Sequence, residues 1–331
     1  MTAITRYLLK SPGKHKKRMF PLSISIRSPI QQSTLRIMSE IAEIVASLVK
    51  VEGCDIGQND SMGNPPLTWA AENGHEGVVK ILLGRDDLDP NKPGEYGQTP
   101  LLWAARNGHQ GMVKMLLGRD DIDPDKQNEY GQTPLLWAAC NGHKGVVRVL
   151  LKRDDVDPNK PDQLGQTPIL WAAWNGHEGV VKMLLRRGDV NPNGLSEGSP
   201  TPLGCAARNM QEGMVKMLLE RDDVDSDKPD QDGRTPLWWA AATGHEGLVK
   251  LLLGQSVVNP DKPDSHGETP LRSAASNGHE ELVKLLLGRD DVNPDKPDDE
   301  GLTPLWWAAK NGHARVVALL QPSTSANHST A

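Results

Sequence analysis

Residues 97–117 read GQTPLLWAARNGHQGMVKMLL, and this stretch contains the signals for two short helices joined by a tight turn. Thr99 is a good N-cap, and Pro100 suits the first helical position, where its missing N–H is one that the helix leaves unpaired anyway. Gly108 is placed to end this helix in a left-handed conformation. The residues after it are apolar at i, i+1, i+4 and i+5, which makes one stripe on a second helix. The stretch therefore predicts an antiparallel helix pair with one buried face.

The Thr-Pro signal recurs at a fixed period of 34 residues, and Pro65-Pro66 stands one step upstream of the first copy. The copies are Thr99-Pro100, Thr133-Pro134, Thr167-Pro168, Thr201-Pro202, Thr235-Pro236, Thr269-Pro270 and Thr303-Pro304. Segments rich in Asp, Pro, Asn and Gly, such as residues 118–131, separate the helix pairs and predict an extended finger or turn. Eight repeats from about residue 60 to residue 320 predict a solenoid, in which each unit buries its apolar face against its neighbours.

The repeated pattern G-x-T-P-L-x-x-A-A-x-x-G-H-x-x-x-V-x-x-L-L resembles the ankyrin repeat, and the resemblance covers about four fifths of the 331-residue chain. The resemblance implies an all-α ankyrin-repeat solenoid, a curved stack whose first helices and hairpin-like fingers line the concave side. It also implies a non-catalytic module that binds a protein partner on that side. One residue more than the usual period of about 33 lies in the finger, which should lengthen the finger without disturbing the helices.

The ends of the chain differ from the repeats in composition. Residues 1–32 are expected to form a basic disordered tail, 33–62 a degenerate N-terminal capping repeat, 63–320 the eight-repeat domain, and 321–331 a polar disordered tail. No polar C-terminal cap is visible, so we expect the outer end of the eighth repeat to be exposed.

Two departures from the pattern carry predictions about packing. A tryptophan stands at the third position after most Thr-Pro pairs, and its repetition favours packing between repeats over contact with a partner. The fifth repeat departs most, because Cys205 stands where a tryptophan is expected and Asn209-Met210-Gln211 replaces Asn-Gly-His. We expect a local weak point there.

The resemblance also implies where a partner would bind, since the variable positions flank the repeat glycine and follow the Ala-Ala pair. At these positions Tyr96, Tyr130, Leu164 and Trp174 predict an apolar and aromatic strip across three repeats, which is the composition of a binding hot spot. The same positions contribute arginines, namely Arg106, Arg208 and Arg234. Isolated exposed aromatic residues without a partner remain the alternative interpretation. Repeats six to eight present a polar, mixed-charge surface suited to specificity.

Several function classes are disfavoured. Residues 37–331 hold 29 basic and 43 acidic residues, a net charge of −14 that suits nucleic acid poorly. No apolar run approaches the ~20 residues of a membrane span. One histidine per repeat cannot converge on a metal ion, and the Asp runs lack the Gly and Glu of a calcium-binding loop, so solvated helix ends are expected. No catalytic motif stands out, so we expect neither an enzyme nor a cofactor.

The N-terminal 36 residues hold eight Lys/Arg and no Asp or Glu. The patch from Lys14 to Arg18 is typical of nuclear import, an acid-free start rich in serine is typical of a mitochondrial presequence, and a tail without a role is the third interpretation. Three widely spaced cysteines indicate a reducing compartment, so a cytoplasmic location is expected. We also expect a monomer. The second functional hypothesis is the recognition end of a larger multidomain signalling protein of the nucleotide-binding receptor kind.

Overall fold

The computed structural model describes residues 59–60, 63–194 and 200–321. The chain divides into two units, 1–51 and 52–331, and the described residues belong to the second. The basic N-terminal tail, all but two residues of the predicted capping repeat and residues 322–331 lie outside the described residues. The predictions made for those segments therefore stay predictions.

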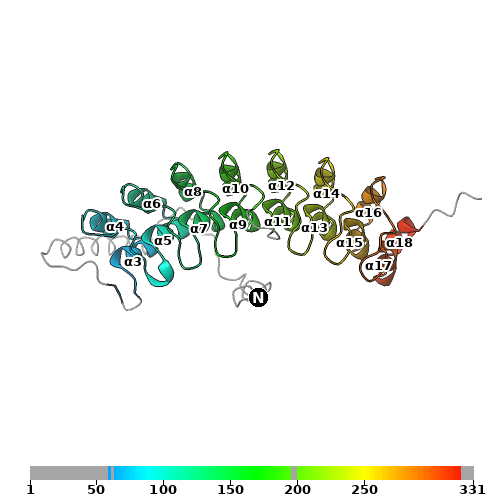
Figure 1. The fold of residues 1–331 in the computed structure, drawn as a ribbon, viewed down its shortest axis with the longest axis horizontal. Helices are drawn as coiled ribbons and strands as arrows, with labels where there is room; N and C mark the ends of the chain where they lie inside the picture. Colours follow the sequence, from blue (N-terminus) through cyan, green and yellow to red (C-terminus); the bar gives the residue numbers. More distant parts are fainter. Residues whose placement is uncertain (1–58, 61–62, 195–199, 322–331) are drawn as a thin grey trace, which may run out of the picture. The chain divides into compact units, whose positions relative to one another are not determined.

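Within the described ranges the regular elements are helices, and they alternate along the chain between two rows (Figure 1). The first row holds α3 (Pro66–Glu72), α5 (Pro100–Arg106), α7 (Pro134–Cys140), α9 (Pro168–Trp174), α11 (Pro202–Arg208), α13 (Pro236–Thr243), α15 (Pro270–Ser276) and α17 (Pro304–Lys310). The second row holds α4 (Glu76–Leu83), α6 (Gln110–Leu116), α8 (Lys144–Leu150), α10 (Glu178–Leu185), α12 (Glu212–Leu219), α14 (Glu246–Leu253), α16 (Glu280–Leu287) and α18 (Ala314–Leu320). Each helix packs on its pair partner and on the same helix of the next repeat. The predicted all-α solenoid is confirmed.

The start of each first-row helix follows from the Thr-Pro pair. The Thr99 hydroxyl oxygen accepts a hydrogen bond from the Leu102 N–H at 3.2 Å, and Pro100 occupies the first turn. The same cap forms in the next six repeats. In the first repeat Pro65 takes the cap position and supplies no side-chain bond. Caps of this kind stabilise a helix by about 1 kcal/mol each.

The core lies between the two rows. The alanine pair of each first-row helix from α3 to α15 is fully buried, as at Ala104 and Ala105, so the helices can approach closely. Each second-row helix turns a Val and a Leu inward, such as Val113 and Leu116. In the last described repeat Trp306 is 41% exposed and Ala309 is exposed, unlike the buried alanine pairs of the earlier repeats.

The turn between paired helices explains the repeated Gly-His. Gly142 adopts φ 73°, a left-handed conformation that favours glycine, and an added Cβ would lie 2.6 Å from His177 Nδ1. The His177 Nε2–H donates to the Cys140 carbonyl of the preceding repeat at 2.9 Å. The equivalent bond forms at three more repeats, from His143, His279 and His313. The histidines are therefore turn residues that join neighbouring repeats, as predicted.

The Asp runs after the second-row helices are exposed to solvent, as expected, and they also form ion pairs. Arg119 forms a two-pronged ion pair with Asp121, and its Nη1 donates to the Leu83 carbonyl of the preceding repeat at 3.0 Å. The guanidinium hydrogen bond lowers the pKa of Asp121. Five further repeats hold the same pair, in Arg85–Asp87, Arg153–Asp155, Arg187–Asp189, Arg221–Asp223 and Arg289–Asp291.

Successive fingers are joined through their backbones, although no strand forms in the part of the chain that the structure describes. The Glu129 N–H donates to the Tyr96 carbonyl, and the Gln163 N–H donates to the Tyr130 carbonyl, both at 3.0 Å. Gly131 must be glycine here, because a Cβ would lie 2.8 Å from the Gln163 nitrogen. These contacts fix the finger tips beside the first-row helices.

Candidate protein-interaction site

A groove with a volume of 570 Å³ lies where α3, α5 and α7 meet their fingers. Five aromatic side chains line it: Trp69, Tyr96, Trp103, Tyr130 and Trp137. The fingers contribute the tyrosines and the helices contribute the tryptophans. We call this the aromatic groove. Its size and lining are those of a site for a small ligand or for part of a partner.

The two tyrosines lie side by side at the finger tips. Their ring centroids are 6.3 Å apart, and Tyr96 is 50% and Tyr130 38% exposed. A hydrogen bond to the Glu95 carboxylate raises the pKa of the Tyr96 hydroxyl. Tyr96 has φ 56°, which is unusual for a residue with a side chain. The finger thus holds Tyr96 in a fixed position facing solvent.

The tryptophan column is not core, which corrects the sequence-based interpretation in part. Trp103 and Trp137 are half-buried and line the groove, whereas only the neighbouring Leu102 and Leu136 are fully buried. The column still joins repeats, because the Arg106 guanidinium lies 4.9 Å from the Trp103 centroid and 4.3 Å from the Trp137 centroid. A cation so placed is attracted to both ring faces.

Four tryptophans of the column donate their N–H group to the finger of their own repeat. Nε1 of Trp137 donates to Gln132 Oε1 at 3.1 Å, and Nε1 of Trp171 donates to Asp162 Oδ2 at 3.1 Å. Trp239 and Trp307 bond likewise to Asp230 and Asp298. Each ring is therefore held by its polar edge and presents its apolar faces.

Trp103 lacks such a bond. Its Nε1 has no hydrogen-bond partner among the described residues, and neither has Oε1 of the buried Gln98. The finger position that holds Asn128 in the third repeat holds Gly94 in the second. A side chain at Gly94 would not fit, because its Cβ would lie 2.1 Å from Asn64 Oδ1. An unpaired buried donor or acceptor costs about 1–3 kcal/mol. The base of the aromatic groove is thus polar and unsatisfied.

Three carboxylates line the same groove: Asp60, Glu72 and Glu95. Glu72 ends α3 and Glu95 lies in the finger of the second repeat, and neither forms an ion pair with a described residue. Glu72 occupies in the first repeat the position that Arg106 occupies in the second. The aromatic groove therefore combines ring faces, the guanidinium of Arg106 over Trp103 and Trp137, and two carboxylates that form no ion pair with a described residue.

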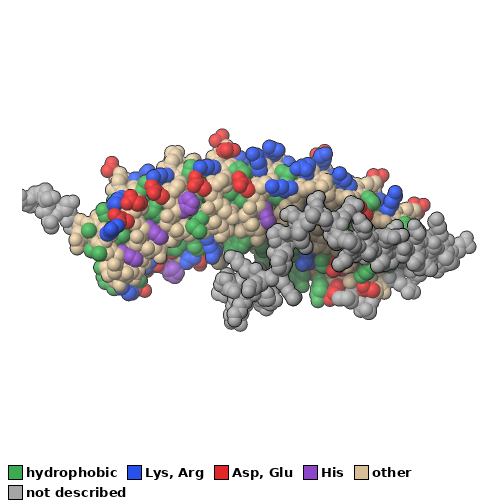
Figure 2. Space-filling view, turned by 180° about the vertical axis from the view of Figure 1, so that it is seen from behind, with side chains coloured by type: hydrophobic (Ala, Val, Ile, Leu, Met, Phe, Trp, Pro, Cys, Tyr) green, Lys and Arg blue, Asp and Glu red, His purple; other side chains and the backbone are tan. Residues whose placement is uncertain are grey.

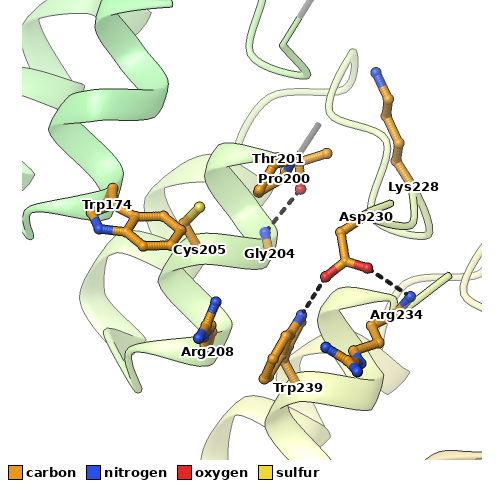
Figure 3. Close-up of a pocket in the computed structure, with 10 residues that line it drawn as sticks. All are labelled: Trp174, Pro200, Thr201, Gly204, Cys205, Arg208, Lys228, Asp230, Arg234 and Trp239. Atoms are coloured by element: carbon orange, nitrogen blue, oxygen red, sulfur yellow. Dashed lines mark hydrogen bonds between the residues drawn. The ribbon is translucent and has the colours of Figure 1, made fainter. Parts of the chain in front are cut away.

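A second hollow, of about 20 Å³, lies where α9, α11 and α13 meet, and Figure 3 shows its lining. We call it the recess. Gly204 and Cys205 stand where other repeats have a large side chain, and this absence opens the space. Arg208 fills it from one side, 5.5 Å from the Trp174 centroid and 4.5 Å from the Trp239 centroid. The recess is thus occupied by the chain's own cation.

Acidic residues compensate the arginines of the recess. Asp230 accepts from Trp239 Nε1 and from the Arg234 backbone N–H (Figure 3). Arg234 pairs with Asp232 at 3.0 Å and lies over the Trp238 and Trp239 rings. Burial raises the pKa of the Cys205 thiol to about 12, so this sulfur is not a nucleophile at neutral pH.

The structure places the predicted site residues in two groups. Tyr96, Arg106 and Tyr130 line the aromatic groove, whereas Trp174, Arg208 and Arg234 line the recess. Leu164 is 50% exposed and Trp174 is 42% exposed, and Leu164 lines neither hollow.

Sequence reasoning missed Glu72 and all three tryptophans of the groove, and Trp69 was not considered at all. Trp103 and Trp137 were assigned to the core, and Glu72 was not considered, although it directly follows an Ala-Ala pair and so occupies a variable position. That position was the available signal for Glu72.

Charged side chains gather on another part of the described surface. Lys, Arg, Asp and Glu gather along the row of second helices (Figure 2). No group of three or more His, Cys, Asp or Glu among the described residues could hold a metal ion. No helix in these ranges combines the length and apolarity that crossing a membrane requires.

Stacked helix pairs with a half-exposed aromatic column define a helical repeat protein with an interaction face. The family model for ankyrin repeats matches residues 35–128, 120–194, 190–264 and 248–330, and the chain belongs to the ankyrin-repeat family. The crystal structure of the ankyrin repeat domain of Bcl-3, described as a unique member of the IkappaB protein family, is similar at 28% identity and a TM-score of 0.59. The match covers 68% of this chain and 99% of that one. A comparison with curated proteins gave no match.

Proposed function

We propose that this protein is a non-catalytic scaffold that binds a protein partner on its concave face, formed by the first-row helices and the fingers. Membership of the ankyrin-repeat family supports a role in protein–protein interaction. The observation that carries the proposal is the set of exposed apolar side chains on this face, Tyr96, Tyr130, Leu164 and Trp174. Solvent-exposed rings whose positions are already fixed lose little conformational entropy when a partner binds, so they contribute strongly to affinity.

The two groups of site residues have different roles in this proposal. Tyr96 and Tyr130, with the groove beside them, supply affinity, because aromatic residues in a hollow dominate most interfaces. Trp174, Arg208 and Arg234 supply a second contact with fixed cations, and the acidic and basic side chains of the later repeats supply specificity. We further propose a cytoplasmic monomer. The alternative role, as the recognition end of a larger signalling protein, uses the same face.

The test begins with a partner isolated on the immobilised full chain and identified by mass spectrometry. Its dissociation constant is then measured by calorimetry against the wild-type chain and against the double variant Tyr130→Ala/Trp174→Ala. We expect affinity to fall at least thirtyfold, because each truncated anchor is a hot-spot residue.

The matched control is Val257→Ala, which truncates a side chain that is 67% exposed outside both hollows. This variant should bind as the wild type does, and both variants should keep the wild-type circular dichroism spectrum. Equal affinity of the double variant and the wild type would remove the proposed binding face.

A further inference from the structure

We propose that the aromatic groove is a binding site for an arginine side chain of the partner, whose guanidinium lies against the Trp69 and Trp103 rings and pairs with Glu72. The proposal rests on the proposed function, since it names the chemistry by which a protein partner is recognised. It assigns a specific ligand group to residues that line one hollow of 570 Å³.

The molecule itself shows what these ring pairs accept. Between the second and third repeats, the Arg106 guanidinium lies within 5 Å of two tryptophan centroids, and Arg208 lies between two rings on either side of the fifth repeat. Lys310 lies 4.6 and 4.4 Å from the Trp306 and Trp307 centroids in the last repeat. At three places, therefore, the cationic residue that directly follows the Ala-Ala pair lies over tryptophan rings.

The first repeat reverses this arrangement. Trp69 and Trp103 line the groove, but the residue at the position equivalent to Arg106 is Glu72. No described Lys or Arg lies over the Trp69 ring, whose nearest ring neighbour is His75 at 4.9 Å. Arg106 already lies over the Trp103 ring, so Trp69 is the ring of this pair without a described cation over it. A free ring and a carboxylate without an ion-pair partner among the described residues are the complement of a guanidinium.

Two further observations favour arginine over a simple ammonium. Gln98 lies 94% buried at the base of the groove, since it is 6% exposed, and its Oε1 has no partner. Glu95 adds a second carboxylate at the rim. A guanidinium has five N–H donors in one plane and stacks on rings, so it can pair with Glu72, reach toward Gln98 and still cover a ring. An ammonium is a compact point charge that cannot stack.

The indole N–H of Trp103 also differs from its equivalent in the third repeat. The Trp137 N–H donates to Gln132 Oε1, whereas the Trp103 N–H is buried and has no partner among the described residues. The Trp103 indole resonance is therefore a probe inside the groove that no hydrogen bond to a described residue fixes.

The test uses a capped peptide, acetyl-Gly-Arg-Gly-amide, titrated into the full chain labelled with nitrogen-15. The readout is the indole N–H resonance of Trp103, assigned from its loss in Trp103→Phe. We expect a saturable shift with a dissociation constant on the order of 1 mM, as for one side chain. The citrulline peptide has the same shape without charge and should bind at least tenfold more weakly, and the lysine peptide severalfold more weakly.

Three variants identify the groove as the site. Glu72→Arg should abolish the shift, because the new side chain would occupy the ring faces as Arg106 does in the next repeat. Glu72→Gln should weaken binding about tenfold, since one charge is removed and the shape kept. Glu178→Gln removes a carboxylate from the second-row helix α10, outside both hollows, and should bind as the wild type does.

The outcomes separate this proposal from the proposed function. Equal binding of the arginine and citrulline peptides, or an unchanged shift in Glu72→Arg, would overturn the arginine site. If Tyr130→Ala/Trp174→Ala loses the partner while Glu72→Arg keeps it, the binding face stands and the arginine site fails. A peptide response that appears only after residues 14–18 are all changed to serine would assign the groove to the chain's own basic segment, which also overturns the proposal.

Discussion

The aromatic groove and the recess are built from equivalent elements, yet one is open and the other is filled. The groove lies among α3, α5 and α7 and measures 570 Å³, whereas the recess lies among α9, α11 and α13 and measures about 20 Å³. Both contain tryptophans at the surface of first-row helices. In the recess Arg208 covers the rings, and in the groove the equivalent position of the first repeat is Glu72.

The difference shows which position decides the chemistry of a repeat. The residue after the Ala-Ala pair lies at the end of the first helix, beside the ring of the next repeat. In the fifth repeat Arg208 covers the rings with the chain's own charge, whereas Glu72 in the first repeat leaves the Trp69 ring without a described cation over it. The identity of this one residue therefore changes the charge beside the rings while the paired helices remain.

The largest expected effect concerns packing under the two hollows. Leu136 in α7 is 1% exposed and occupies the position that is Gly204 in α11. Leu136→Ala leaves a cavity beneath the groove and should lower the free energy of unfolding by about 2–5 kcal/mol. Urea unfolding followed by far-ultraviolet circular dichroism measures this loss. Val257→Ala, at an exposed position, serves as the control and should lie within about 0.5 kcal/mol of the wild type.

A loss below about 1 kcal/mol in Leu136→Ala would show that the third repeat is packed as loosely as the fifth at this position. The contrast between a supported groove and an underpacked recess would then fail.

The next effect converts one hollow into the other. Arg208→Glu removes the cation from between Trp174 and Trp239 and puts a carboxylate in its place, as at Glu72. We expect the recess to gain binding of acetyl-Gly-Arg-Gly-amide, with an affinity within about tenfold of the groove. The measurement is a second saturable shift, at the Trp239 indole resonance, assigned from Trp239→Phe.

Arg208→Gln is the matched control, because it removes the cation without adding a charge, and it should bind the peptide much more weakly. If Arg208→Glu gains no second site while the groove still binds, the identity of this one residue does not decide between the two hollows. The geometry of the groove would then be the decisive factor.

The fold was predictable from sequence because its signals are local and repeated. Thr99 and Pro100 start a helix, Gly108 ends it, and similar signals recur along the repeats. An ambiguous signal in one repeat can therefore be interpreted from its copies in the others. The exposed residues of the last repeat were expected for a similar reason, because a capping repeat would have polar residues on its outer face. The turn role of the histidines followed from their spacing alone.

The site was only partly predictable. The exposure of Tyr96 and Tyr130 followed from their variable positions, but the half-exposed tryptophans did not follow from their pattern. A residue that recurs in most repeats is expected to have a structural role, but repetition does not say whether that role lies in the core or at the surface. Trp137 has its role at the surface, where it stacks with Arg106. Gly94 and Asn64 meet across two fingers, where a Cβ at Gly94 would lie 2.1 Å from Asn64 Oδ1, and no local pattern encodes such a meeting.

A smaller effect tests the strain near the recess. Met210 adopts φ 55° at the turn position that is glycine in the other repeats, such as Gly142. A side chain in this conformation costs about 1 kcal/mol, so Met210→Gly should raise the free energy of unfolding by about that amount. Gly142→Ala is the opposite change and should lower it by more, because its Cβ would also meet His177 at 2.6 Å. Urea unfolding of both variants checks the signs, and a loss of stability in Met210→Gly would show that the methionine side chain contributes more than its backbone costs.

The smallest effect concerns Cys140, which occupies the deciding position in the third repeat, between the two hollows. Burial raises the pKa of its thiol to about 11, so the reactive thiolate is scarce at neutral pH. Alkylation by iodoacetamide, followed by mass spectrometry of the peptide that contains Cys140, should be at least tenfold slower than for glutathione at neutral pH. Because the thiolate fraction grows as the pH rises toward the pKa, the rate should increase about tenfold per pH unit below pH 10. A rate that levels off near the ordinary thiol pKa of about 8.5 would mean that water reaches Cys140, and that the groove continues along the face past the third repeat.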